Sequence, residues 1–109
     1  MATRSDLFID QGTDFTTVLT LTDEDGNPLN LANANSSGQI RKSYTSLTYT
    51  SFTTEINSIS AEITLSLDAA STGDLEAGRY VYDVELVDAA NSTTRIVEGV
   101  ITIAPQVTR

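Results

Sequence analysis

Two alternating apolar runs near the C-terminal end constrain the fold of this chain more than any other feature. Most apolar side chains of the first run share one parity: Tyr80, Tyr82, Val84 and Leu86. The acidic residues Asp83 and Glu85 share the opposite parity. Because successive side chains of a β-strand point to opposite faces, this run predicts a strand with one buried face and one solvated face.

The second run follows a short polar linker at residues 89–92 and has Val97, Ile101 and Ile103 on one parity. Two strand-like runs joined by about four small or polar residues are typical of an antiparallel hairpin. We therefore expect residues 79–103 to form a hairpin at the centre of the hydrophobic core.

The length of 109 residues fits one domain with one core, spanning residues 1–109. The chain has no cysteine and no histidine, which removes disulfides, thiol chemistry and the commonest general base and metal ligand. A formal net charge of −9 opposes nucleic-acid binding. No apolar run reaches the roughly 18 residues of a membrane span, and the N-terminus lacks an apolar signal region. We expect neither nucleic acid nor membrane as a partner.

Other strand-like runs recur at spacings of about ten residues, with turn signals between them. One of them has five apolar residues on a single face: Ile59, Ala61, Ile63, Leu65 and Leu67. Residues 47–56 are another strand candidate, in which the parity changes from Leu47 and Tyr49 to Phe52 and Ile56 and so predicts a bulge or a break near Ser51. Gly12 predicts a bulge or bend that lets the chain pass between sheets. The pattern predicts an all-β fold, a single antiparallel immunoglobulin-like β-sandwich of about seven strands.

The remaining segments are expected to be turns and loose ends. Residues 1–5 are predicted as a flexible arm and residues 104–109 as a C-terminal tail. Asp68 is expected to cap a single helical turn, with Leu75 packed under the end of the sandwich. The acidic segment at residues 23–28 is expected to be an ordinary turn, because an EF-hand calcium loop starting at Asp23 would have Ala34 at its twelfth position.

No catalytic, cofactor or metal site is predicted. Serine and threonine are abundant, but a nucleophilic hydroxyl needs an activating base, and the chain has no histidine. Asp83 and Glu85 share one strand face, and we interpret them as part of a solvated surface rather than a glycosidase pair. We expect no enzymatic activity.

Several stretches carry a family resemblance: residues 11–15, 25–29, 39–42, 63–67, 78–85, 97–102 and 105–108. The most characteristic is residues 78–85, which read GRYVYDVE. Together these stretches, within residues 6–108, resemble small immunoglobulin-like β-sandwich structural proteins of tailed bacteriophages. In particular, they are similar to the N-terminal domain of phage baseplate upper proteins.

The resemblance implies a bacteriophage virion structural protein, a tail, baseplate or head-surface subunit that works through protein–protein assembly contacts. Its partners would be other virion proteins or copies of itself, and its location the virion, after synthesis in the host cytoplasm. The alternative is a ligand-binding sandwich module of the carbohydrate-binding or adhesin type. The absence of tryptophan disfavours that alternative.

Two short segments are candidates for assembly contacts. Leu7, Phe8 and Ile9 form an apolar run at a chain end, which could dock on a neighbour's sheet edge or form the first strand of its own sandwich. Arg41 and Lys42 could dock on an acidic partner, although we favour an edge strand guarded by charge.

Overall fold

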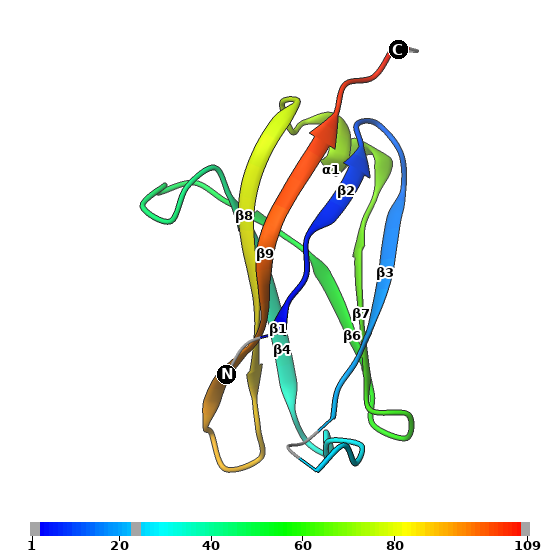
Figure 1. Ribbon diagram of the computed structural model, residues 1–109, viewed down its shortest axis with the longest axis vertical. Helices are drawn as coiled ribbons and strands as arrows, with labels where there is room; N and C mark the ends of the chain where they lie inside the picture. Colours follow the sequence, from blue (N-terminus) through cyan, green and yellow to red (C-terminus); the bar gives the residue numbers. More distant parts are fainter. Residues whose placement is uncertain (1–2, 23–24, 108–109) are drawn as a thin grey trace.

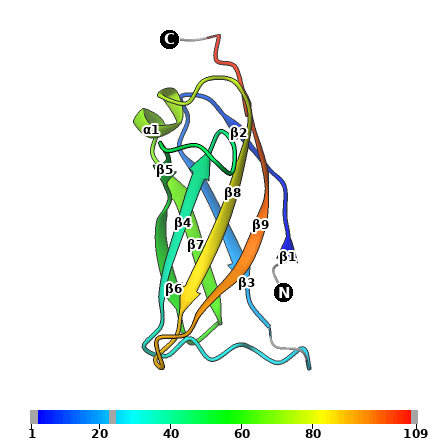
Figure 2. The same ribbon diagram turned by 90° about the vertical axis from the view of Figure 1, so that its left-hand side faces the viewer.

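The chain folds into two β-sheets packed face to face, as the computed structural model of residues 3–22 and 25–107 shows (Figures 1 and 2). The larger sheet contains β1 (Thr3–Arg4), β2 (Leu7–Asp10), β4 (Asn35–Arg41), β5 (Thr50–Ser51), β8 (Gly78–Val87) and β9 (Thr93–Ala104). The smaller sheet contains β3 (Phe15–Thr20), β6 (Thr53–Asn57) and β7 (Glu62–Leu67). The predicted all-β sandwich is confirmed, whereas its immunoglobulin-like topology stays a prediction.

The β8–β9 hairpin lies at the centre of the six-stranded sheet, as predicted. Its strands pair antiparallel, and the register shifts between Val84 and Glu85, which leaves Ile96 as an extra residue on β9. The inward side chains of the hairpin are buried: Tyr82, Val84, Leu86, Val97, Ile101 and Ile103. The alternation read from the sequence therefore gives the correct facing for both strands.

Strand β7 is the central strand of the smaller sheet, between β3 and β6. Its inward residues Ile63, Leu65 and Leu67 are buried and join the hairpin residues in one core. The ring of Phe52 connects the two sheets, because it packs edge-on against Tyr82 and tilted against Phe15. The predicted core residues are therefore confirmed as one cluster.

The N-terminal segment belongs to the six-stranded sheet. Strands β1 and β2 both pair with β9 in parallel, and the Ser5 amide between them donates to the Glu98 carbonyl at 2.9 Å. The prediction of a flexible arm over residues 1–5 is wrong for residues 3–5, while Met1 and Ala2 lie outside the described residues. The expected antiparallel sandwich thus has one parallel edge.

The predicted bend at Gly12 is confirmed. Gly12 has a φ of +79° and connects β2 in the larger sheet to β3 in the smaller one. The predicted break near Ser51 is also confirmed, since β5 ends there and β6 starts after the buried Phe52. These interruptions, with the separation of β1 from β2, give nine strands among the described residues instead of about seven.

The short helix α1 (Ala69–Gly73) confirms the predicted capped turn. The Asp68 carboxylate accepts a hydrogen bond from the Ser71 amide at 2.8 Å, and this bond lowers the pKa of Asp68. Leu75 is buried beneath the end of the sandwich, as expected. At the C-terminal end, Ala104 is the last residue of β9 rather than the first of a tail.

Two strand predictions are wrong at their ends. Ile59 is 96% exposed because the chain turns at residues 58–61, where Ala61 has a φ of +54° and Asn57 Oδ1 accepts from the Ile59 amide at 3.1 Å. Leu47 and Tyr49 precede β5 and are exposed rather than part of a strand. At Ile59 the apolar parity of β7 continues into a segment in which the backbone turns.

Candidate assembly surface

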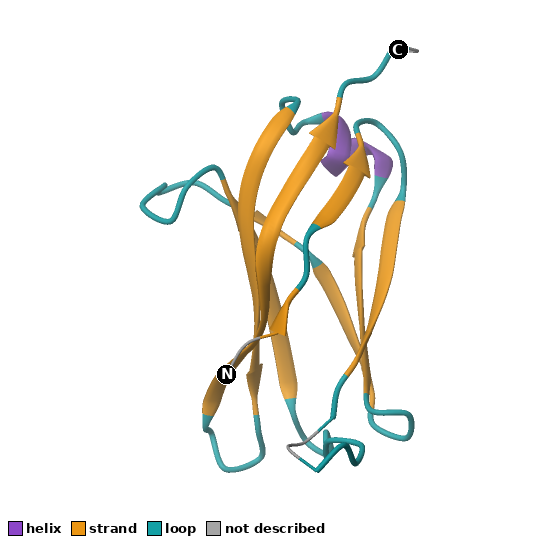
Figure 3. Cartoon of the chain, viewed as in Figure 1, coloured by secondary structure: helices purple, strands orange, loops and turns teal. Residues whose placement is uncertain are grey.

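The loop between β4 and β5 projects away from the sandwich, to the left in Figure 1. It is drawn in teal in Figure 3. We call residues 42–49 the projecting loop. It turns at residues 43–46, where the Ser46 amide donates to the Ser43 carbonyl at 3.1 Å and Ser46 Oγ accepts from the Ser43 amide at 3.0 Å. Its apolar side chains face solvent: Tyr44 is 75% exposed and Leu47 is 94% exposed.

Arg41 anchors one side of the projecting loop. Its Nη1 donates to the Ser46 carbonyl at 2.6 Å, and its Nη2 donates to Gln39 Oε1 at 3.0 Å. The guanidinium also lies 4.8 Å from the centre of the Tyr49 ring, within the range of a cation–π contact. Arg41 therefore ties the loop to the last residues of β4.

Lys42 anchors the other side of the loop to β8. Its Nζ lies 4.6 Å from the centre of the Tyr80 ring, and the Tyr80 hydroxyl donates to the Glu76 carbonyl at 2.8 Å. Partial burial, with the nearby Glu76 carboxylate, raises the pKa of Tyr80. The structure corrects the edge-strand interpretation of this basic pair, because the end of β4 lies between β8 and β5.

The base of the projecting loop borders a shallow pocket of about 170 Å³. Its lining residues come from β4, the loop, β8 and β9: Gln39, Arg41, Tyr44, Val81, Tyr82, Asp83 and Arg95. Arg95 is already paired, with Nε 3.2 Å from Asp83 Oδ2 and Nη1 3.2 Å from Glu98 Oε2. Asp83 thus belongs to a surface ion-pair network, as expected for a solvated strand face.

The N-terminal candidates Leu7, Phe8 and Ile9 form strand β2 of this sandwich rather than a free arm. Ile9 pairs with Ile103 and is 1% exposed, so its side chain is part of the core. Phe8 points the other way and is 78% exposed. Since β2 pairs with β9 and the projecting loop follows β4, these two candidate segments lie on opposite sides of the central hairpin and are not brought together.

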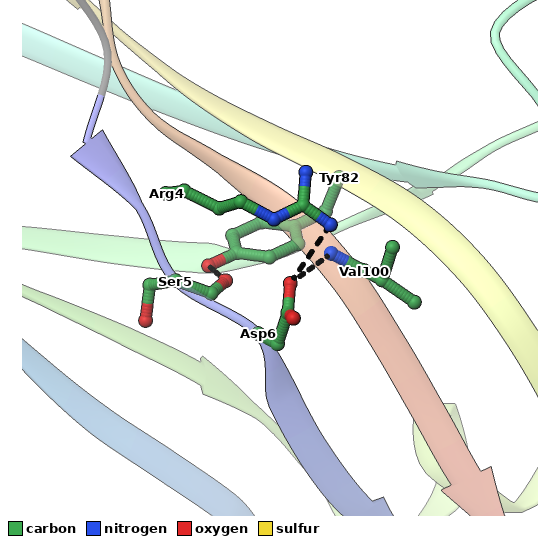
Figure 4. Close-up of polar contacts among 5 residues, drawn as sticks. All are labelled: Arg4, Ser5, Asp6, Tyr82 and Val100. Carbon is green, nitrogen blue, oxygen red and sulfur yellow. Dashed lines mark hydrogen bonds and ion pairs between the residues drawn. The ribbon is translucent and has the colours of Figure 1, made fainter.

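Figure 4 shows how the N-terminal segment is fastened to the sheet. The buried Tyr82 hydroxyl donates to the Ser5 carbonyl, and Asp6 Oδ1 accepts from the Val100 amide at 3.0 Å. Arg4 forms an ion pair with the same Asp6 oxygen at 3.4 Å. Burial raises the pKa of Tyr82, because loss of solvent disfavours the charged phenolate.

Metal-ligating side chains do not gather in the described part of the chain. Within residues 3–22 and 25–107, no group of three or more acidic, histidine or cysteine side chains is arranged to hold a metal ion. Asp23 and Glu24 of the acidic turn lie outside this part of the chain. The same part of the chain contains no helix with the length and apolar character that a membrane crossing requires. The predicted absence of catalysis, cofactor and metal stays a prediction.

Sequence reasoning missed Tyr44, Leu47 and Tyr49 as surface residues. The spacing of Leu47 and Tyr49 predicts a strand, and no sequence pattern points to Tyr44. The available signal was the group of small hydroxyl residues around Tyr44, at Ser43, Thr45 and Ser46, which is typical of a turn.

Comparisons with known proteins bear on the fold alone. No protein-family model matches the chain, and no curated protein matches it. Among solved structures, the chain is similar to a Listeria monocytogenes internalin-like protein, lmo2027, with a TM-score of 0.55 and 23% sequence identity. The match covers 94% of this chain and 28% of that chain, so this chain spans little more than a quarter of that protein.

Proposed function

We propose that this chain is a non-enzymatic structural module that acts through protein–protein contacts, and that its setting is the virion of a tailed bacteriophage. The virion setting comes from the sequence resemblance. The observation that supports contact with other proteins is the projecting loop, which holds exposed Tyr44 and Leu47 outside the sandwich. Aromatic and arginine side chains are enriched in the buried centres of protein interfaces.

The anchoring of the loop supports the same function. A surface that is already ordered loses less conformational entropy when it binds, so its contacts contribute more to affinity. Arg41 and Lys42 hold the two sides of the loop through Tyr49 and Tyr80. In this proposal the basic pair serves the contact by holding the loop in shape.

The pocket at the base of the loop is a poor fit for a small-molecule ligand. Its volume of about 170 Å³ is below the roughly 300–1,000 Å³ typical of small-molecule sites. Its charged residues Asp83 and Arg95 already pair with each other. A partner protein that covers the loop and this hollow together fits the geometry better.

The test is incorporation into phage particles. Particles purified from cells that produce the wild-type chain should contain it, and the double variant Tyr44→Ser with Leu47→Ser should reduce the incorporated amount by roughly tenfold or more, because interface-centre side chains dominate binding. Ile59→Ser is the matched control, since Ile59 is equally exposed but lies in the β6–β7 turn. A wild-type chain absent from particles would refute the virion setting, and normal incorporation of the double variant would refute the loop.

A further inference from the structure

Strand β3 has hydrogen-bonding groups directed away from its own sheet. It pairs with β7 on one side, and the Leu21 amide that continues the ladder donates to the Ala61 carbonyl at 2.8 Å. Bonded and outward-facing residues alternate along an antiparallel strand. The amides and carbonyls of Thr16, Val18 and Thr20 therefore face outward, and no hydrogen bond between described residues uses them.

This edge lacks the features that protect the other edges of the sandwich. Natural sheets guard their edges with charges, proline, bulges or very short strands. The β1–β2 edge carries Arg4, Asp6 and Asp10, and β5 has only two residues. The sequence of β3, FTTVLT, contains no charge, proline or glycine over six residues.

Strand β6, at the other edge of the smaller sheet, is also protected. It contains Glu55, and its Thr54 hydroxyl donates to the Ser36 carbonyl of β4 at 3.1 Å. The edge of β3 is therefore the long uncharged edge among the described strands, and Val18 at its centre is exposed.

Charge indicates what could pair with this edge. The ionisable side chains on the smaller sheet and at its ends are all acidic within the described residues: Asp14, Glu55, Glu62 and Asp68. The described cations lie on the larger sheet or in the projecting loop: Arg4, Arg41, Lys42, Arg79 and Arg95. An incoming segment with positive charge would be attracted to the smaller sheet, and an acidic one would be repelled.

We propose that the outer edge of β3 accepts an extended, lysine- or arginine-bearing segment of a partner protein, which adds a fourth strand to the three-stranded sheet. Main-chain hydrogen bonds to Thr16, Val18 and Thr20 provide the pairing, and the surrounding carboxylates select for the cationic segment. This site is separate from the projecting loop, which follows β4 of the other sheet. A negative result for one proposal therefore does not contradict the other.

The test uses the full chain and three synthetic peptides, read by amide hydrogen exchange and chemical-shift changes. The peptide KTVTVTVK should slow exchange of the Thr16, Val18 and Thr20 amides and leave the Thr54 and Ile56 amides of β6 unchanged. The acidic peptide ETVTVTVE should bind about tenfold more weakly at low salt, with the difference shrinking as salt is added. A copy of KTVTVTVK with N-methyl groups on alternate residues should not protect β3, because it cannot pair.

Two variants of Val18 give a second measurement. Val18→Pro removes an outward amide while leaving the bonds to β7 intact, so the chain should fold and lose peptide binding. Val18→Lys keeps the amide and should weaken binding of KTVTVTVK by about tenfold through repulsion. Equal binding of KTVTVTVK and ETVTVTVE, or unchanged binding by both variants, would overturn the proposal. So would protection of β3 that rises with protein concentration alone, because the edge would then pair with a second copy.

Discussion

The two sheets share one hydrophobic core, yet their outer surfaces differ. The larger sheet and the projecting loop carry the described cations, several of which have partners, as in the Asp83–Arg95 ion pair and the Lys42–Tyr80 contact. The smaller sheet presents mainly hydroxyl and acidic side chains, including Thr16, Thr64 and Glu62. Most inward side chains of both sheets are apolar and pack in the shared core. The two sheets therefore differ in the charges on their outer faces, which do not contact the core.

Two kinds of contact hold the strands of this sandwich in place. Strands β3 and β7 depend on ladder hydrogen bonds and inward apolar side chains. In the larger sheet, specific side chains also fasten the added segments, as Tyr82 does for Ser5. Removing such a side chain should weaken one segment, whereas removing an inward leucine should weaken the whole molecule.

The largest effects are expected from matched leucine deletions in the two sheets. Leu65→Ala in β7 and Leu86→Ala in β8 each remove a buried side chain, which should lower the free energy of unfolding by about 2–5 kcal/mol. Denaturant unfolding should remain a single transition by fluorescence and circular dichroism, because the two sites share one core. Two separate transitions would show that the sheets are energetically independent, and exposed Val18→Ala serves as the control.

A smaller effect is expected where the N-terminal segment passes close to Gly99 of β9. A Cβ added at Gly99 would lie 2.2 Å from the Ser5 carbonyl oxygen, so Gly99→Ala should displace this segment and lower stability by about 1–3 kcal/mol. Hydrogen exchange should accelerate at the Ser5 amide and stay slow in β7. Gly73→Ala is the matched control, since its Cβ would meet nothing closer than 3.8 Å. Equal effects of the two substitutions would contradict the close approach.

The smallest effect is expected from Tyr82→Phe, which keeps the ring and removes the hydroxyl bond to Ser5. The variant should lose about 1 kcal/mol at neutral pH. Because burial raises the folded-state pKa of Tyr82 above the ordinary value, the unfolded state ionises first as pH rises. Wild-type stability should therefore fall above about pH 10, and the variant should lack this part of the fall.

Urea unfolding at pH 7, 10 and 11 measures both parts of this prediction. Tyr44→Phe, at an exposed position, is the control for removal of a tyrosine hydroxyl. If the free energy of unfolding falls equally with pH for wild type and Tyr82→Phe, the Tyr82 hydroxyl is not the group that causes the alkaline loss of stability.

Period-2 alternation was enough to predict the core. Residues such as Leu65, Val84 and Ile101 alternate with polar neighbours, and burial follows their parity because one face of each strand lies against the other sheet. The same rule fails at Ile59, because Asn57 Oδ1 accepts a hydrogen bond from the Ile59 amide and stabilises a turn. In the turn, alternate residues no longer point to one face of a strand. A local turn contact of this kind overrides a pattern that is read residue by residue.

The candidate assembly surface was predicted only in part. Arg41 and Lys42 stood out as a basic pair, but their roles depend on Tyr49 and Tyr80, and Tyr80 lies on another strand. The parallel pairing of Leu7–Asp10 with β9 is likewise a contact between the two ends of the chain. Alternation along one strand carries no information about which distant strand lies beside it.

The parallel pairing of β2 with β9 has a mechanical consequence. In Figure 1 β2 begins near the middle of the molecule and runs beside β9 toward the end at which the chain leaves β9. Tension applied through the two ends would pull these neighbouring strands in opposite directions along their own axes. The hydrogen bonds from Leu7↔Ile101 to Asp10↔Ala104 would then be loaded together in shear instead of opening one after another. The sandwich should therefore resist stretching until the hydrogen bonds between β2 and β9 break together.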